Sequence, residues 1–128
     1  MSLRAILKYV LGAFFVLAGA NHVRNPAFYV AIMPPHIPFH LALVYVSGLL
    51  EAALGLMLLV PRTKRLAAWG LMLLLVAIFP ANVQMALHPE LYPRTSAVLL
   101  WARLPLQGVL LAWAYGYTRP GAPRLERP

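Results

Sequence analysis

The sequence predicts an all-α fold, a four-helix transmembrane bundle with a short interfacial helix in its first outer connection. Of the 128 residues, 62% are hydrophobic and only 11% are charged. A water-soluble domain of this composition would have too little polar surface to cover its own core. Four apolar runs are long enough to cross a bilayer, and the basic residues are concentrated in alternate connections. Together these observations indicate a polytopic membrane protein.

The four apolar runs contain 17 to 22 residues each. A helix rises about 1.5 Å per residue, so about 20 residues span the roughly 30 Å hydrocarbon core of a bilayer. We predict a single transmembrane domain over residues 1–118, with helices over residues 5–21, 41–60, 66–87 and 97–117. Residues 119–128 contain three prolines and are predicted to form a disordered cytoplasmic tail.

The first apolar run also has features of a signal peptide, because Arg4 and Lys8 accompany an apolar stretch that ends in Ala18-Gly19-Ala20. We favour a retained helix, since it would have three further helices to pack against. The membrane-spanning interpretation therefore includes this run.

The connection between the first two spans is rich in proline. Asn25-Pro26 is a favourable helix start, and Pro34-Pro35 is a helix stop. The apolar run Ala27 to Met33 between them predicts a short helix at the membrane interface, which could cap the bundle on its outer side.

The basic residues indicate how the chain is oriented. Eight of the eleven Lys and Arg residues lie at the start of the first span, between the second and third spans, or after the fourth. By the positive-inside rule both termini are expected on the cytoplasmic side of the cell membrane. The formal net charge of +8 is then an orientation signal, and no nucleic-acid partner is predicted.

Two charged residues lie deep inside the predicted spans, although a charge at a helix centre costs about 2.5–3.5 kcal/mol. Glu51 belongs to the second span and Arg103 to the fourth. Counted from the outer ends of the helices, their depths agree within about a few Å at about 1.5 Å per residue. We therefore expect a buried ion pair between them, because either charge alone in low dielectric would be costly.

Other polar side chains are expected at the same depth. Pro80 and Pro105 free the carbonyls of Val76 and Trp101 from helical hydrogen bonding, which favours nearby polar partners. We predict a small polar pocket in the outer half, with six ligand-binding candidates: Asn21, His22, Glu51, Asn82, Arg103 and Gln107. The alternative is a polar clasp that fixes helix register and binds no ligand.

Several classes of site are not supported by the sequence. It contains no cysteine, which excludes disulfides and thiolate chemistry. Prolines interrupt the spacing of His36 and His40, and no carboxylate-rich shell accompanies the four histidines, so no metal site is predicted. Nucleotide-binding loops and nucleophile elbows are absent. We assign no catalytic residues and expect no catalytic activity from the chain on its own.

A resemblance to a known family covers nearly the whole chain. Its segments are Gly19-Ala20-Asn21-His22, the proline-rich stretch through Pro38, Ser47-Gly48-Leu49-Leu50-Glu51, Ile78-Phe79-Pro80-Ala81-Asn82 and Arg103-Leu104-Pro105-Leu106-Gln107. They resemble the DoxX-like family of small four-helix membrane proteins, and the last two segments are the most specific. The resemblance implies a link to membrane redox systems, because some relatives are subunits of thiosulfate:quinone oxidoreductase and others belong to redox-stress complexes. A more distant eukaryotic branch acts in receptor assembly.

Three functions are compatible with these observations. The first is an accessory component of a membrane redox system that binds a quinone or a lipid in the polar pocket. Without cysteine, a redox role requires a bound quinone or a partner membrane subunit. The second is a small-solute or proton-coupled transporter, which would need a homodimer because four helices are few for alternating access. The third is an assembly partner of a larger membrane complex.

Overall fold

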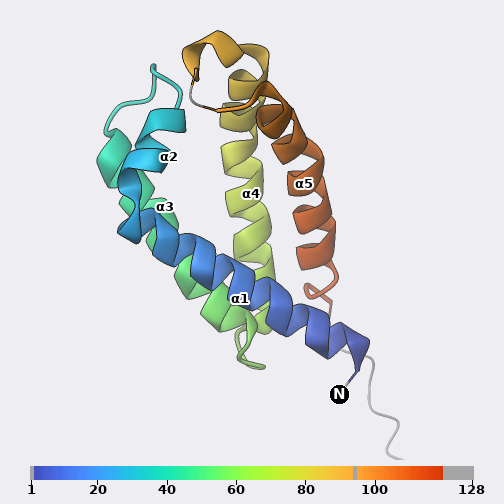
Figure 1. Cartoon of the computed structure of the whole chain (residues 1–128). Coiled ribbons are helices and arrows are strands. Elements are labelled where there is room, and N and C mark those ends of the chain that lie inside the picture. The colour runs from blue at the N-terminus through green and yellow to red at the C-terminus, as the bar shows by residue number, and fades with distance from the viewer. Residues whose placement is uncertain (1, 94, 120–128) are drawn as a thin grey trace, which may run out of the picture.

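The computed structural model describes residues 2–93 and 95–119, and within these ranges all regular structure is helical (Figure 1). The four long helices are α1 (Leu3–Arg24), α3 (His40–Leu58), α4 (Lys64–Leu87) and α5 (Ala97–Tyr115). The short helix α2 (Pro26–Ile32) follows α1, and a 3-10 helix, η1 (Pro89–Leu91), follows α4. All four long helices are long and apolar enough to cross a membrane. The predicted all-α four-helix architecture is confirmed.

The outward faces of the long helices are apolar. Leu17 on α1 is 70% exposed, Leu73 on α4 is 72% exposed and Val98 on α5 is 78% exposed. Water-soluble monomers rarely expose so many large apolar side chains together, whereas hydrocarbon tails solvate them well. The chain thus has the architecture of a multi-pass membrane protein in contact with lipid.

The helix boundaries differ slightly from the sequence prediction. The interfacial helix is present as α2 and begins at Pro26, as the sequence indicates. Helix α1 continues to Arg24, and it stops there because Asn25 precedes a proline and leaves the helical conformation, with φ −133° and ψ 62°. Helices α3 and α5 end two residues earlier than expected, within the usual variation of helix ends. Of the predicted tail 119–128, all but Arg119 lies outside the described residues.

The four long helices form two pairs that meet at one end and separate at the other (Figure 1). Helix α1 packs along α3, and α4 packs along α5. We call the end where α1 begins and α5 ends the narrow end; it also holds the turn between α3 and α4. The opposite end, which carries α2 and η1, is the wide end. The backbones of the two pairs are therefore farther apart at the wide end than at the narrow end.

Glycines allow α1 and α3 to approach closely. Gly12 and Gly19 lie seven residues apart on α1, and Gly48 and Gly55 lie seven residues apart on α3. A Cβ atom at Gly48 would lie 2.9 Å from the carbonyl oxygen of Gly19, and one at Gly55 would lie 2.8 Å from that of Gly12. The two backbones are therefore in direct contact, as in small-residue crossings of membrane helices.

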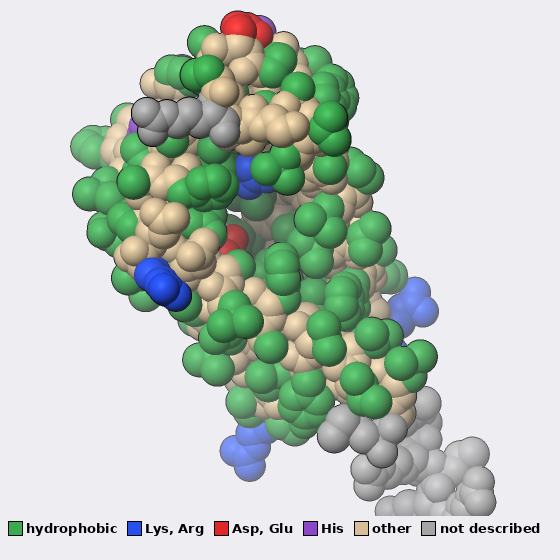
Figure 2. Space-filling view, viewed as in Figure 1, with side chains coloured by type: hydrophobic (Ala, Val, Ile, Leu, Met, Phe, Trp, Pro, Cys, Tyr) green, Lys and Arg blue, Asp and Glu red, His purple; other side chains and the backbone are tan. Residues whose placement is uncertain are grey.

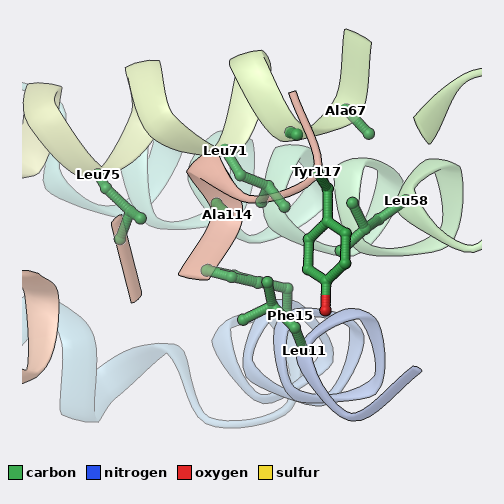
Figure 3. Close-up of a cluster of buried hydrophobic side chains, with 9 residues drawn as sticks. Leu11, Phe15, Leu58, Ala67, Leu71, Leu75, Ala114 and Tyr117 are labelled. Atoms are coloured by element: carbon green, nitrogen blue, oxygen red, sulfur yellow. The ribbon is translucent and has the colours of Figure 1, made fainter. Parts of the chain in front are cut away.

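The narrow end is closed by a hydrophobic core to which all four long helices contribute (Figure 3). Its buried members are Leu11, Phe15, Leu58, Ala67, Ala68, Leu71, Leu75, Ala114 and Tyr117. The Tyr117 ring packs in this core, and its hydroxyl donates a hydrogen bond of 2.9 Å to the carbonyl of Arg4. This contact joins the end of the chain's last helical segment to the start of its first helix.

Arg65 also holds the narrow end together, and its loss is expected to lower stability. Its Nε donates to the carbonyl of Thr118 over 2.7 Å, which gives a partner to a carbonyl just beyond the end of α5. Arg65→Ala should reduce the free energy of unfolding by about 1 kcal/mol, the usual contribution of one such hydrogen bond. The measurement is thermal unfolding in mild detergent followed by circular dichroism.

Arg62→Ala provides the matched control, because the structure gives Arg62 no hydrogen-bond partner within the described residues. Its midpoint should equal that of the wild type. Equal midpoints for the Arg65 and Arg62 variants would show that the Arg65 contact does not stabilise the bundle.

Candidate ligand-binding cavity

A cavity of about 420 Å³ lies between the two helix pairs toward the wide end. Figure 2 shows it as a hollow on the face that α1 crosses, with basic and acidic side-chain atoms visible inside. This volume falls within the roughly 300–1,000 Å³ of small-molecule pockets. Its walls are mainly apolar; the polar side chains that line it are His22, Tyr29, Ser47, Glu51, Asn82 and Arg103. The cavity therefore suits a mainly apolar molecule with a small polar group.

The two charged residues of the cavity do not form the direct ion pair that the sequence predicts. No nitrogen of Arg103 lies within 4.0 Å of a Glu51 carboxylate oxygen in the described part of the chain. Glu51 lies eleven residues after the start of α3 and Arg103 six residues after the start of α5, which corresponds to about 16 Å and about 9 Å along the helices. The helix pairs also separate here, so both charges face the same cavity from different heights.

The carboxyl group of Glu51 is buried and only partly satisfied. The residue is 8% exposed, and the nearest basic atom is Nδ1 of His22, 3.6 Å from Oε2. That distance is too long for a hydrogen bond. Among the described residues Oε2 has no hydrogen-bond partner, although nearly all buried polar atoms in proteins have one. An uncompensated acceptor of this kind marks a position where a ligand or water can bind.

His22 is fixed by contacts on both sides of its ring. Its Nδ1 lies 2.6 Å from the carbonyl of Ala18. Because a carbonyl can only accept, Nδ1 carries the hydrogen. The ring stacks on Tyr29 of α2, with ring centroids 3.7 Å apart and planes at 17°. Asn21 donates to the Tyr29 hydroxyl over 2.7 Å. These contacts hold α2 against the end of α1 and shape one wall of the cavity.

Arg103 has few partners for its hydrogen-bond donors. Its guanidinium offers five N–H groups, and Nη1 lies 3.9 Å from Sδ of Met85, a weak acceptor. Within the described residues no oxygen accepts a hydrogen bond from Arg103. The cationic head thus retains donors that can bind an oxygen of a molecule in the cavity.

Asn82 and Gln107 are engaged with each other. Asn82 Nδ2 donates to Gln107 Oε1 over 2.6 Å, and Gln107 Nε2 donates to the carbonyl of Leu75. This network joins α4 and α5 beside their internal prolines, Pro80 and Pro105. The carbonyl that accepts from Gln107 belongs to Leu75, whereas the sequence predicts freed carbonyls at Val76 and Trp101. For these two residues the geometry fits the clasp alternative.

The six candidate ligand-binding residues therefore occupy three kinds of position. Four of them line the cavity: His22, Glu51, Asn82 and Arg103. Gln107 instead lines a smaller groove of about 210 Å³ between α4 and α5. Asn21 contacts the cavity only through Tyr29.

Tyr29, Ser47, Met33 and Met85 line the cavity but were missed by sequence reasoning. Tyr29 lies seven residues after His22, a helical spacing, but the helix break at Asn25 removes the basis for predicting that the rings meet. Ser47 lies one turn before Glu51, and this i, i+4 spacing could have identified it. Neither methionine carries a polar signal: Met33 follows α2 in the outer connection and Met85 lies in α4.

The remaining histidines lie apart from the cavity lining. His40 Nε2 lies 3.2 Å from the Pro34 carbonyl, and His88 Nδ1 lies 3.2 Å from a Glu90 carboxylate oxygen. The described residues contain no group of three or more His, Asp and Glu side chains that could hold a metal ion.

Comparison with curated proteins and with solved structures finds no match for this chain. A family model described as a domain of unknown function (DUF8561) matches residues 11–118, a range that includes every residue lining the cavity. Because this match covers well over half of the sequence, the chain belongs to the DUF8561 family.

Proposed function

We propose that this protein binds a membrane-soluble amphipathic molecule, a quinone or a lipid, in the cavity between its helix pairs. The observation that carries the proposal is the pair of unsatisfied groups inside apolar walls, the guanidinium of Arg103 and the Oε2 atom of Glu51. Burying a charge or an acceptor without a partner is unfavourable. A ligand that supplies the missing hydrogen bonds would stabilise the folded state.

The two groups have complementary requirements. Arg103 donates only, so it binds a carbonyl, phosphate or carboxylate oxygen of the ligand. The Glu51 carboxylate accepts a hydrogen bond from a ligand hydroxyl, or donates one to a ligand carbonyl when it is protonated. Quinone and lipid head groups both carry oxygens of this kind. The apolar walls suit the ring or the first methylene groups of the tail.

We also propose how the cavity is placed in the cell. The basic residues of the narrow end put both termini on the cytoplasmic side of the cell membrane, so the cavity lies in the outer half. The motifs around Glu51, Asn82 and Arg103 that resemble the DoxX-like family support an accessory role in a membrane redox system. In that role the protein would present or store a quinone for a partner subunit.

The proposal predicts that Arg103→Met removes a co-purifying small molecule. Wild-type protein in native nanodiscs, examined by native mass spectrometry, should carry the excess mass of a bound molecule. The occupancy of that molecule in the variant should fall about tenfold or more, a loss of about 1.4 kcal/mol in binding free energy. The mass distinguishes a quinone from a phospholipid and from a partner subunit. Methionine approximates the length of the arginine stem, and its flexible apolar side chain is compatible with a membrane-spanning helix.

Arg62→Met is the matched control, since Arg62 lies at the narrow end away from the cavity. It should retain the same mass as the wild type. Arg103→Lys keeps the charge and serves as a second variant if Arg103→Met does not accumulate. Retention of the ligand by a folded Arg103→Met protein at wild-type level would refute binding through this residue.

A further inference from the structure

We propose that the ligand enters the cavity sideways from the bilayer, between α1 and the α4–α5 pair, and leaves its apolar tail in that opening. This inference rests on the proposed function, because it names the route and the class of molecule for the same cavity. The ligand is then a single-tailed or slender lipid-soluble compound with an oxygen-bearing head, and a small water-soluble solute is not its substrate.

The cavity is walled off toward the wide end by apolar packing. Ile32 of α2 packs with Met85 of α4, Leu100 of α5 and Tyr92 in a second buried cluster. Ile32 and Met85 also line the cavity, so this cluster forms its wall on that side. The Tyr92 side chain belongs to this cluster and is 3% exposed, so the packing closes this end with large side chains. A polar solute coming from the water would have to cross that layer.

On the side that α1 crosses, the cavity is not closed by such a cluster of described residues. Leu11 and Phe15 of α1 pack against the core at the narrow end. One turn further along the same face is Ala18, followed after another turn by His22, which lines the cavity. The small, half-buried side chain of Ala18 therefore lies on this face of α1 between the narrow-end core and the cavity. The hollow in Figure 2 opens on this face of the molecule.

This opening lies at the level of the hydrocarbon core. Ala18 is six residues before the end of the 22-residue helix α1, or about 9 Å from it at about 1.5 Å per residue. A span of that length covers the roughly 30 Å of a bilayer core, so an opening at this depth faces lipid tails and not water. Molecules that partition into the bilayer reach it, and their tails remain solvated by lipid while the head binds inside.

The test narrows the opening and measures ligand exchange. Ala18→Phe puts a large side chain in the opening, and Ala20→Phe is the matched control, because Ala20 is exposed and lies about 200° further round the helix. Proteins in nanodiscs are mixed with 2-decyl-1,4-benzoquinone, with 2-methyl-1,4-benzoquinone or with 11-bromoundecanoate. All three quench tryptophan fluorescence. Trp101 is exposed and lies about 200° round α5 from Arg103, so probe dissolved in the bilayer also quenches it, and the signal of bound probe is the quenching that Arg103→Met lacks. Empty nanodiscs give the background.

Lateral entry predicts that Ala18→Phe slows association and dissociation of the tailed probe at least about tenfold, a barrier increase of about 1.4 kcal/mol. Ala20→Phe should exchange at the wild-type rate. At equal total concentration the tailless quinone should bind weakly, since each methylene of a tail contributes about 0.8 kcal/mol to partitioning from water into the bilayer. Preference between the decyl quinone and the bromo fatty acid identifies the head group. Ala18→Leu provides a smaller obstruction should the phenylalanine variant fail to fold.

A failure of lateral entry can be distinguished from a failure of the binding function. Protein-dependent quenching by the tailed probes with equal exchange rates in the Ala18 and Ala20 variants would overturn lateral entry and leave the binding function intact. Equal quenching by every probe in the wild type and in Arg103→Met would overturn the binding function and the route together.

Discussion

Gly19→Val and Gly48→Val are expected to separate α1 from α3 and to leave little folded protein in mild detergent. At both positions an added Cβ would meet backbone atoms of the facing helix, which have no alternative rotamer to adopt. Overpacking of cores usually costs about 1–3 kcal/mol, and contact with backbone places these variants at about 3 kcal/mol or more. The measurement is the unfolding transition in increasing SDS at fixed mild-detergent concentration, followed by circular dichroism.

Gly108→Ala is the control for this prediction. A Cβ atom at Gly108 would meet nothing within 4 Å, and alanine is about 1 kcal/mol more favourable than glycine inside a helix. This variant should unfold at the same SDS fraction as the wild type or later. An equally stable Gly48→Val protein would mean that α1 and α3 do not touch through their glycines.

The second large effect is expected in the network of Asn82 and Gln107. Gln107→Leu removes the acceptor of the Asn82 amide and the side-chain donor to the Leu75 carbonyl, so it leaves the buried Asn82 amide without a partner and the carbonyl with its place in α4 alone. An unsatisfied buried group costs about 1–3 kcal/mol. Replacing both amides, as in Asn82→Leu with Gln107→Leu, removes this penalty. The double variant should therefore be more stable than the sum of the single changes indicates.

A double-mutant cycle measures this coupling, again from SDS unfolding, and we expect about 1 kcal/mol. Gln84→Leu is the control, because the Gln84 side chain has no hydrogen bond within the described residues although it is on the same helix. It should change stability little. Strict additivity of the two single changes would show that the amides act independently.

The spans could be predicted from sequence because each depends on local properties. Length and hydropathy identify α3 and α4, and the Asn25-Pro26 pair places the start of α2 at the correct residue. These signals do not depend on how the helices are arranged in space.

The partners of the charged residues could not be predicted in the same way. Counting depth from helix ends assumes that the helices stand side by side with their ends level. The two pairs instead diverge, so Glu51 lies closest to His22 of α1 and Arg103 extends into the cavity alone. Residue spacing gives the face of one helix, but not the tilt between two. Gln107 shows the same limit, since it turns toward α4 rather than into the cavity.

The glycine contact between α1 and α3 also has a consequence for biosynthesis. Helices leave the ribosome in order, so α1 enters the bilayer with its glycine face exposed to lipid until α3 has been synthesised. The first stable assembly intermediate should be this antiparallel pair with α2 attached, and α4 and α5 dock onto it afterwards. Arg103 is delivered by the last helix to be inserted. Until that moment the cavity wall holds the Glu51 carboxyl without the guanidinium of Arg103, and truncated chains that end before α5 should be targets of membrane quality control.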